Sequence, residues 1–192
     1  RLTPQQANLY TSLGVILAMR RNFDEAIACF QQAVALNPRE ARAWAQLGTL
    51  MFMRQDYGTA AQMLERAISL QPDDAQALHQ LAVVSIARGD RQAAANQLGS
   101  LLQIEPDNAE AWIDLAVLML SDQQIDKALD MIDRALAITP DDPRGQYYYG
   151  AALAQTGQMD DARQIMSALA QRVPDHKYGQ WAQRFLDGEG EG

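Results

Sequence analysis

Two histidines, one cysteine and three pairs of adjacent acids are the residues of this 192-residue chain whose types could do chemistry. His79 and His176 could bind a metal ion or transfer a proton if the fold brought them together. The thiol of Cys29 could act as a nucleophile if a nearby cation lowered its pKa. Carboxylates serve as metal ligands and as acid–base catalysts. The three acid pairs are Asp73-Asp74, Asp141-Asp142 and Asp160-Asp161.

The sequence lacks the motifs that place such residues around a substrate or an ion. No GxxxxGK[ST], GxGxxG, HExxH or CxxC occurs. The acid pairs also lack the alternating spacing of a calcium-binding loop. The formal net charge is −8, and no basic cluster is denser than Arg20-Arg21. We therefore expect no binding of nucleic acid, which needs many basic contacts to phosphate.

The apolar segments are too short for a membrane span. The longest apolar run is Leu115 to Leu120, whereas a spanning helix needs about 20 residues. The first residues also lack the pattern of a signal peptide, in which a positively charged region precedes an apolar one. We expect no direct membrane insertion. Because the single Cys29 cannot form an internal disulfide, the localisation stays open between the cytoplasm and the bacterial periplasm.

Five prolines recur with a period of 34 residues, and no insertion breaks that spacing. They are Pro38, Pro72, Pro106, Pro140 and Pro174. A fixed period of this length indicates internal repeats that stack on one another. The repeats are residues 7–40, 41–74, 75–108, 109–142 and 143–176.

The same places in each repeat, counted from its first residue, carry the same kinds of side chain. Place eight is always Gly or Ala, as expected where two helices approach closely, and place twenty is always Ala. Place twenty-four is always large and apolar, as in Phe30 and Met166. Place four is large and apolar in every repeat except the fifth, where it is Gln146.

This pattern resembles the tetratricopeptide repeat (TPR) family, whose repeats read W-x2-L-G-x2-Y, then A-x3-F, then P. The resemblance implies an all-α fold, a right-handed superhelical solenoid of five helical hairpins. The local pattern agrees, because Tyr10, Leu13 and Leu17 lie on one stripe of a helix over residues 7–20. A second stripe follows over 26–34, and we expect Asp24 to be the N-cap of that helix.

The ends of the chain predict the limits of one solenoid domain over residues 1–187. Thr3 followed by Pro4 predicts the start of the first helix. Apolar residues at helical spacing from Tyr178 to Leu186 predict a C-terminal capping helix over about 177–187.

Residues 188–192 have no apolar side chain to bury, and we expect a disordered tail there. Because the chain begins at Arg1 without a Met, we expect a segment or a processed form of a longer protein.

The repeat architecture argues against catalysis. It separates His79 from His176 by three hairpins, so the two cannot share a metal ion or act as a pair. Cys29 falls on a second helix, where a small apolar side chain packs well. The acid pairs fall at repeat boundaries or helix starts, where carboxylates cap N–H groups. We predict that the protein is not an enzyme, with no catalytic residues, no metal and no cofactor.

In TPR proteins the first helices of the hairpins line a concave face, and places two, five, six, nine, twelve and thirteen point into it. Carried over to this sequence, these places predict a peptide-binding groove with an apolar strip and a polar rim. The groove residues are Val15, Met19, Arg42, Thr49, Phe52, Met53, His79, Val83, Ile86, Ile113, Asp114, Val117, Leu120, Arg144 and Tyr147.

One known mode of TPR recognition is not reproduced. Some co-chaperone TPR domains hold a partner's C-terminal carboxylate with Lys and Asn side chains. Places five and nine of the first repeat are instead Thr11 and Val15. The sequence therefore favours an apolar ligand over a chaperone tail.

The predicted function is a protein–protein interaction scaffold or adaptor that binds an amphipathic helix or an extended apolar peptide of a partner protein. Arg outnumbers Lys by 14 to 2, which points to a bacterial source and to an assembly, secretion or envelope-biogenesis process. Two alternatives stay open: a self-associating assembler that forms homo-oligomers, and the substrate-presenting TPR region of a larger enzyme such as a glycosyltransferase. We expect Val83→Glu with Ile113→Glu to abolish ligand capture and to leave the fold intact.

Overall fold

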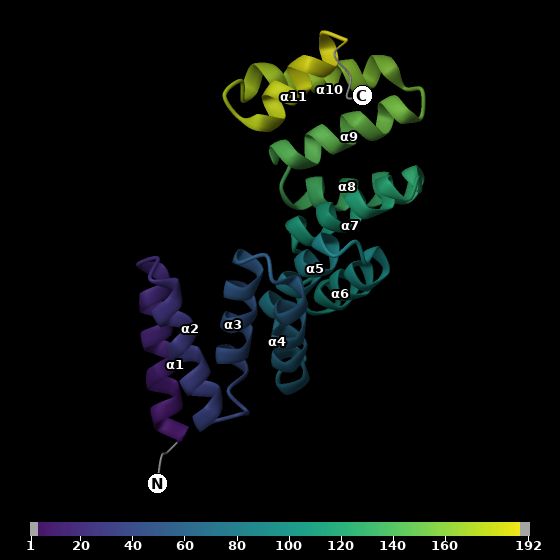
Figure 1. The fold of residues 1–192 in the computed structure, drawn as a ribbon. Coiled ribbons are helices and arrows are strands. Elements are labelled where there is room, and N and C mark those ends of the chain that lie inside the picture. Colours follow the sequence, from purple (N-terminus) through teal and green to yellow (C-terminus); the bar gives the residue numbers. More distant parts are fainter. Residues whose placement is uncertain (1–3, 189–192) are drawn as a thin grey trace. The chain divides into compact units, whose positions relative to one another are not determined.

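The computed structural model describes residues 4–188, which form eleven α-helices and no strand (Figure 1). These helices fall into two compact units, one within residues 1–104 and one within residues 105–192. Both units are built from helical hairpins, as the repeats predict.

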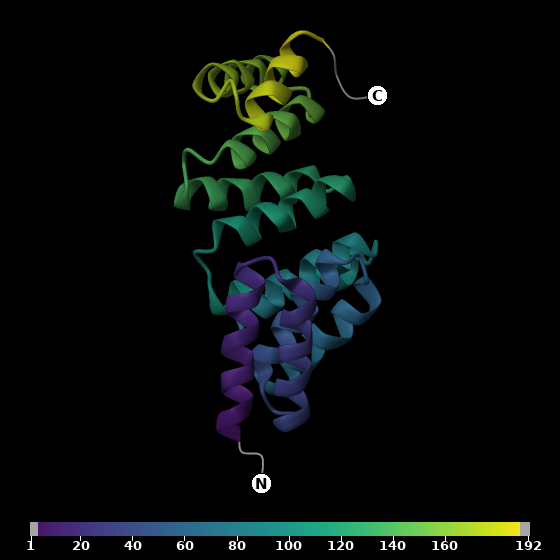
Figure 2. The ribbon, with the colours of Figure 1, turned by 60° about the vertical axis from the view of Figure 1, so that its left-hand side comes forward.

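The first unit consists of three hairpins. Each one pairs two consecutive helices: α1 (Pro4–Met19) with α2 (Phe23–Leu36), α3 (Ala41–Met53) with α4 (Tyr57–Leu70), and α5 (Ala75–Ala87) with α6 (Arg91–Ile104). The hairpins stack because α2 packs against α3 and α4 packs against α5 (Figure 2). Because the chain reverses direction at every turn, α1, α3 and α5 run parallel, and α3 contacts both of the others.

The second unit consists of two hairpins and one further helix. The hairpins pair α7 (Ala109–Ser121) with α8 (Ile125–Ile138), and α9 (Pro143–Gln155) with α10 (Met159–Arg172). The last helix, α11 (Lys177–Leu186), packs against α10 and α9. Its buried residues include Tyr178 and Ala182, whereas Gln180, Gln183 and Arg184 are exposed.

The turn inside every hairpin uses one residue in the left-handed region, always at place fifteen. These residues are Arg21, Gln55, Gly89, Gln123 and Gly157, with φ between 58° and 83°. Only glycine adopts this conformation without steric cost. The turn geometry is therefore set by the repeat, and three of the five repeats adopt it with a larger residue.

The core of each hairpin explains the small residue at place eight. A Cβ atom added to Gly14 would lie 2.6 Å from a ring carbon of Phe30, the residue at place twenty-four of the same repeat. The same addition at Gly48 would lie 2.6 Å from Cγ of Leu64. The two helices of a hairpin thus approach so closely that a large side chain from one fills the space that glycine leaves on the other.

The structure confirms the all-α hairpin fold and corrects one cap. Helix α2 begins at Phe23 with Asn22 as its N-cap, so the expectation that Asp24 caps this helix was wrong. Asp24 lies in the first turn instead, where its charge interacts favourably with the helix dipole. Helix α11 lies within the range of the predicted capping helix.

Two expectations about the ends fall outside the described residues. They are the cap at Thr3 and the tail over 189–192. Gly188, the first residue of that predicted tail, is described and lies in a turn after α11, with φ of 78°. A single solenoid domain over 1–187 stays a prediction.

Candidate functional site

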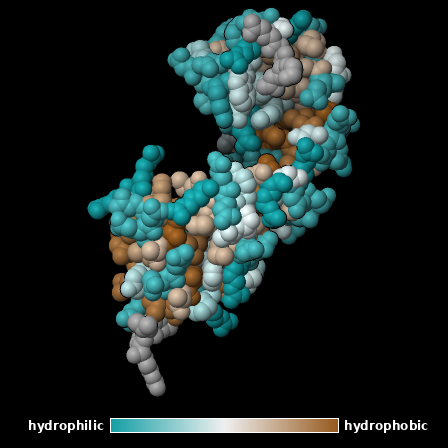
Figure 3. Space-filling model, viewed as in Figure 1, coloured by the Kyte–Doolittle hydropathy of each residue, from teal (hydrophilic) through white to brown (hydrophobic). Residues whose placement is uncertain are grey.

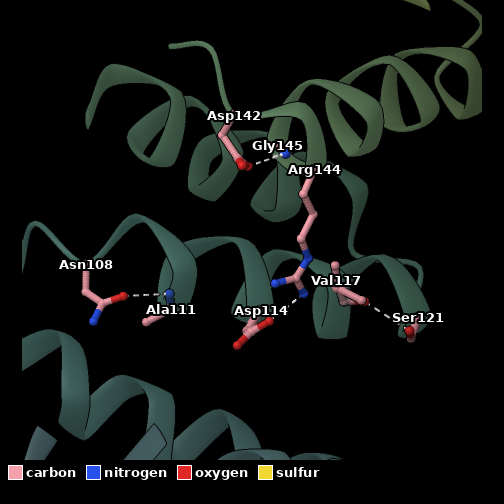
Figure 4. Close-up of polar contacts among 8 residues, drawn as sticks. All are labelled: Asn108, Ala111, Asp114, Val117, Ser121, Asp142, Arg144 and Gly145. Atoms are coloured by element: carbon pink, nitrogen blue, oxygen red, sulfur yellow. Dashed lines mark hydrogen bonds and ion pairs between the residues drawn. The ribbon is translucent and has the colours of Figure 1, made fainter. Parts of the chain in front are cut away.

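Two of the three acid pairs supply a helix cap, whereas Asp160 and Asp161 lie in the first turn of α10. Asp74 accepts a hydrogen bond from the backbone N–H of Ala77 at 2.9 Å, at the start of α5. Asp142 accepts one from the N–H of Gly145 at 2.7 Å, at the start of α9 (Figure 4). These carboxylates satisfy helix-end N–H groups that would otherwise lack partners. Their role is structural.

The thiol and the two imidazoles lie in separate places of the fold. Cys29 is half-buried, and burial together with the charge of Glu25 raises the pKa of its thiol, which disfavours the reactive thiolate. Nδ1 of His176 accepts a hydrogen bond from the backbone N–H of Tyr178 at 3.4 Å and caps α11. His79 is half-buried on α5 in the first unit.

Two further searches within residues 4–188 concern metals and membranes. No group of three or more His, Cys, Asp or Glu side chains in this range is placed to hold a metal ion. No helix there has the length and apolar character of a transmembrane span.

The first unit places nine of the predicted groove residues on one set of parallel helices, α1, α3 and α5. None of the nine is buried. Because the three helices run in the same direction, their C-terminal ends lie on one side of the unit. Met19, Met53 and Ile86 come from those ends, and their side chains are 81%, 55% and 41% exposed. The remaining six are Val15, Arg42, Thr49, Phe52, His79 and Val83.

Helices α3 and α5, with Gln71 and Asp74 of the segment before α5, line a pocket rich in polar side chains, here called the polar pocket. Arg42, Gln46 and Thr49 line it from α3, and Gln76 and Gln80 line it from α5. Glutamine side chains both donate and accept hydrogen bonds, which suits them to bind a peptide main chain. The glutamines were not among the predicted site residues, which were chosen mainly for apolar character. The signal that could have found them is their position at the inner-face places two and six.

We define the inner face of the first unit as this polar pocket together with the exposed side chains of Met19, Met53 and Ile86. Polar groups lie toward the N-terminal ends of the parallel helices, and apolar groups lie at their C-terminal ends. The face therefore has two chemically distinct regions, which could hold two different parts of one ligand.

The second unit buries part of its predicted groove. Ile113 is 3% exposed and Asp114 is 8% exposed, so neither provides the open surface expected of them. Ile113 lies against α9, since a Cβ atom added to Gly145 would lie 3.4 Å from its Cδ1, an ordinary packing distance. This is a correction of the predicted groove. Val117 and Leu120 are half-buried.

The carboxylate of Asp114 forms an ion pair with the guanidinium of Arg144, which reaches across from α9 to α7 (Figure 4). Burial of this guanidinium opposes its charge, but the attraction and hydrogen bond from Asp114 outweigh burial and raise the pKa of Arg144. Of the four polar residues predicted at the rim, Arg42, His79, Asp114 and Arg144, the two in the second unit are therefore bound to each other.

The ring of Tyr147 contacts the helix that ends the second unit. Its centroid lies 5.7 Å from that of Tyr178 and 5.6 Å from that of Trp181, both on α11. Tyr148 contacts Tyr178 as well, at 6.1 Å. Aromatic pairs at these separations stabilise packing. Helix α11 therefore occupies much of the surface that Tyr147 would offer to a ligand.

Comparison with known proteins places this arrangement among TPR proteins. Three family models, each described as tetratricopeptide repeat, match residues 13–83, 85–148 and 122–177. None of the curated proteins matches the chain.

Several solved structures share the fold. The crystal structure of YrrB, described as a TPR protein with an unusual peptide-binding site, has a TM-score of 0.78 at 18% identity and covers 91% of this chain and 90% of its own. MamA from Desulfovibrio magneticus gives 0.79 at 18% identity, with 89% and 98% covered. The pilF protein of Pseudomonas aeruginosa gives 0.81 at 19% identity, with 94% and 82% covered.

Proposed function

The chain belongs to the tetratricopeptide repeat family, and we propose that it is a non-enzymatic protein–protein interaction scaffold whose inner face in the first unit holds a peptide of a partner protein. The observation that carries this proposal is the joint exposure of Met19, Met53 and Ile86 at one end of three parallel helices. Apolar side chains gathered in water gain free energy when a ligand covers them. Methionine is flexible and adapts to varied apolar partners.

The polar pocket favours an extended peptide over a helical one. A helix satisfies its own backbone hydrogen bonds, whereas an extended peptide has free N–H and C=O groups. The amides of Gln46, Gln76 and Gln80 can pair with such groups. We expect the ligand to place apolar side chains on Met19 and Met53, and to pass its main chain over the glutamines. The peptide-binding site named for YrrB, a structure of the same fold, supports this class of ligand.

We place the scaffold in a bacterial assembly, secretion or envelope-biogenesis process. Arg outnumbers Lys by 14 to 2, as in bacteria whose genomes are rich in G and C. Structures of the same fold include two from bacteria, MamA of Desulfovibrio magneticus and pilF of Pseudomonas aeruginosa. These observations support a bacterial process of this kind. An experiment that captures the ligand would identify the partner.

Selection from a library of displayed random peptides tests the proposal. The full chain is the bait, and the selected peptides are then measured by calorimetry against variants. We expect Met53→Glu to weaken binding at least tenfold, because it puts a charge among apolar ligand atoms. The matched control is Met159→Glu on α10, because Met159 is also an exposed methionine, at 40%.

Three outcomes separate the alternatives. Binding lost in Met53→Glu and kept in Met159→Glu supports the inner face. Equal binding by both variants rejects it. If no peptide is selected from the library, the proposal that this chain binds a peptide is rejected.

A further inference from the structure

An exposed arginine follows the first helix of each hairpin in the first unit. Arg20 directly follows α1, and Arg54 and Arg88 are the C-caps of α3 and α5. All three stand at place fourteen of their repeats. Because the three helices run in the same direction, their C-terminal ends lie on one side of the unit. The three residues, here called the arginine row, therefore border the same side of the inner face.

The arginine row belongs to the first unit and is not a feature of every repeat. A cation interacts favourably with the C-terminal end of a helix, which gives arginine a structural advantage there. In the second unit, however, the C-caps at place fourteen are Asp122 and Thr156. The hairpin forms with an acidic or a neutral residue at this place, so the fold does not require arginine there. A binding role explains why the first unit repeats it.

The arginine row adjoins the apolar part of the inner face. Met19 and Met53 each stand directly before an arginine of the row, and Ile86 stands two residues before Arg88. In Figure 3, hydrophilic residues project from the end of the first unit where Figure 1 shows the turn between α1 and α2, and hydrophobic residues lie beside them. A ligand that covers the exposed apolar side chains therefore brings its own polar groups close to the guanidinium groups.

The helices that form the inner face of the first unit carry no acidic residue. Neither Asp nor Glu occurs within α1, α3 or α5. The polar pocket contains Arg42 together with Asp74, so these two charges balance there. Residues 1–104 have nine Lys and Arg against eight Asp and Glu, whereas residues 105–192 have seven against sixteen. The second unit therefore repels an acidic ligand, and the arginine row attracts one.

The carboxylates near the arginine row leave its cations available to a ligand. Asp56 and Asp90, in the turns that follow, each accept a hydrogen bond at 3.1 Å from a backbone N–H at the start of the next helix. Asp24 pairs with Arg54 at the surface, where 47% of the arginine side chain and 89% of the aspartate side chain are exposed. An exposed pair of this kind is weak, so a ligand can replace it. Within residues 4–188, Arg88 forms no ion pair with a carboxylate of the chain.

We propose, on the basis of the peptide-holding function proposed above, that the inner face of the first unit selects an acidic peptide of a partner protein. Asp or Glu side chains of the peptide contact the arginine row, while its apolar side chains cover Met19, Met53 and Ile86. A guanidinium group binds a carboxylate through two parallel hydrogen bonds. The apolar contacts supply affinity, and the arginines restrict binding to acidic sequences.

The arginine row also predicts the spacing of the acidic residues in the ligand. Helix α3 contacts both α1 and α5, and the axes of packed helices lie about 8–10 Å apart. An extended peptide advances about 3.3 Å per residue. Successive arginines are therefore reached by acidic residues about three positions apart, with apolar residues between them.

Fluorescence anisotropy with three labelled synthetic peptides tests this proposal on the full chain. Each peptide repeats one unit of three residues, which is Leu-Glu-Ser, Leu-Gln-Ser or Leu-Lys-Ser. The chain should bind the Leu-Glu-Ser peptide about tenfold more tightly than the Leu-Gln-Ser peptide, and the Leu-Lys-Ser peptide most weakly. Added salt should weaken binding of the acidic peptide and leave that of the neutral peptide nearly unchanged, because salt screens exposed charges.

Reversal of one charge locates the binding site. Arg88→Glu should weaken binding of the Leu-Glu-Ser peptide about tenfold and strengthen binding of the Leu-Lys-Ser peptide, a gain that a misfolded variant cannot show. The matched control is Arg66→Glu on α4, because Arg66 is also an exposed arginine of the first unit but lies on a second helix. The control should leave both affinities unchanged. Circular dichroism checks that both variants fold.

The results separate this proposal from peptide holding itself. If the Leu-Glu-Ser peptide binds no better than the Leu-Gln-Ser peptide, or if Arg88→Glu and Arg66→Glu bind it equally, the selection of an acidic ligand is overturned. Peptide holding stands in that case if peptides from the random library lose affinity in Met53→Glu. Tighter binding of a single-stranded deoxythymidine oligonucleotide than of the Leu-Glu-Ser peptide would assign the arginine row to nucleic acid and would also overturn the proposal.

Discussion

The side-chain amide of Gln146 donates a hydrogen bond to the carbonyl oxygen of Pro140, six residues earlier, at 2.8 Å. Trp44 and Trp112 stand at the same place of their repeats, and their indole N–H groups donate to the carbonyls of the prolines six residues before them, at 3.1 and 2.8 Å. Gln146 is the one departure from a large apolar residue at place four, yet it keeps this bond. The contact fixes the loop that ends one repeat to the first helix of the next.

The side chain of Gln146 also accepts a hydrogen bond from the guanidinium of Arg172, at 2.8 Å. Gln146→Ala removes both bonds and should lower the free energy of unfolding by about 2 kcal/mol, at about 1 kcal/mol for each bond. Gln146→Trp restores the N–H donor to Pro140 but not the acceptor for Arg172, so it should recover about half of that loss. Urea unfolding followed by circular dichroism gives both values. If Gln146→Ala is as stable as wild type, the bond to Pro140 contributes nothing.

Two glycines in the first unit should respond to alanine in opposite directions. Gly89 has φ of 78° in the turn before α6, so Gly89→Ala should destabilise the protein by about 1 kcal/mol. Gly99 lies within α6 with no atom within 4 Å of an added Cβ, so Gly99→Ala should stabilise it by up to about 1 kcal/mol. Thermal unfolding of the two variants checks the signs, and a change of the same sign in both would contradict this account of the turn.

The ion pair of the second unit should matter more than an exposed one. Arg144→Ala leaves the buried carboxylate of Asp114 without its cation, at an expected cost of about 3 kcal/mol. Arg54→Ala removes an exposed pair with Asp24 and should cost less than about 1 kcal/mol. Urea unfolding of each variant measures the difference. Equal losses would show that burial of Asp114 is unimportant.

Stability should fall at alkaline pH because of two tyrosines. Burial raises the pKa of Tyr148 and of Tyr178 above the ordinary value, which is about 10. A group with a raised folded-state pKa stabilises the fold below its unfolded pKa and loses that contribution as pH rises through the folded pKa. Thermal midpoints should therefore drop above about pH 10, and less steeply in the Tyr148→Phe, Tyr178→Phe variant. An equal drop in the variant would assign the effect to other groups.

The fold could be predicted because five repeats of the sequence carry the same residue pattern. Alanine at place twenty and a small residue at place eight are needed wherever two helices approach closely, as Gly14 and Phe30 do. The left-handed turn was harder to predict, because only two of its five residues, Gly89 and Gly157, are glycines.

The burial of Ile113 and Asp114 in the second unit could not be predicted, because it depends on the residues that the neighbouring repeat carries. Gly145 of α9 lies against Ile113, and Tyr178 and Trp181 of α11 contact the ring of Tyr147. These contacts join repeats whose residues differ at equivalent places, so the family geometry alone does not reveal them. The expectation that Val83→Glu with Ile113→Glu preserves the fold does not survive, since the second change would bury a carboxylate at a site that is 3% exposed. Met53→Glu replaces it as the test of binding.

Methyl NMR of the methionines is the most direct test of ligand binding to the inner face. The chain has eight methionines, and with labelled methyl groups each can be followed during titration with a selected peptide. We predict that the signals of Met19 and Met53 shift with a common dissociation constant, while that of Met159 does not move. A shift confined to Met159, or to other methionines of the second unit, would contradict binding at the inner face of the first unit.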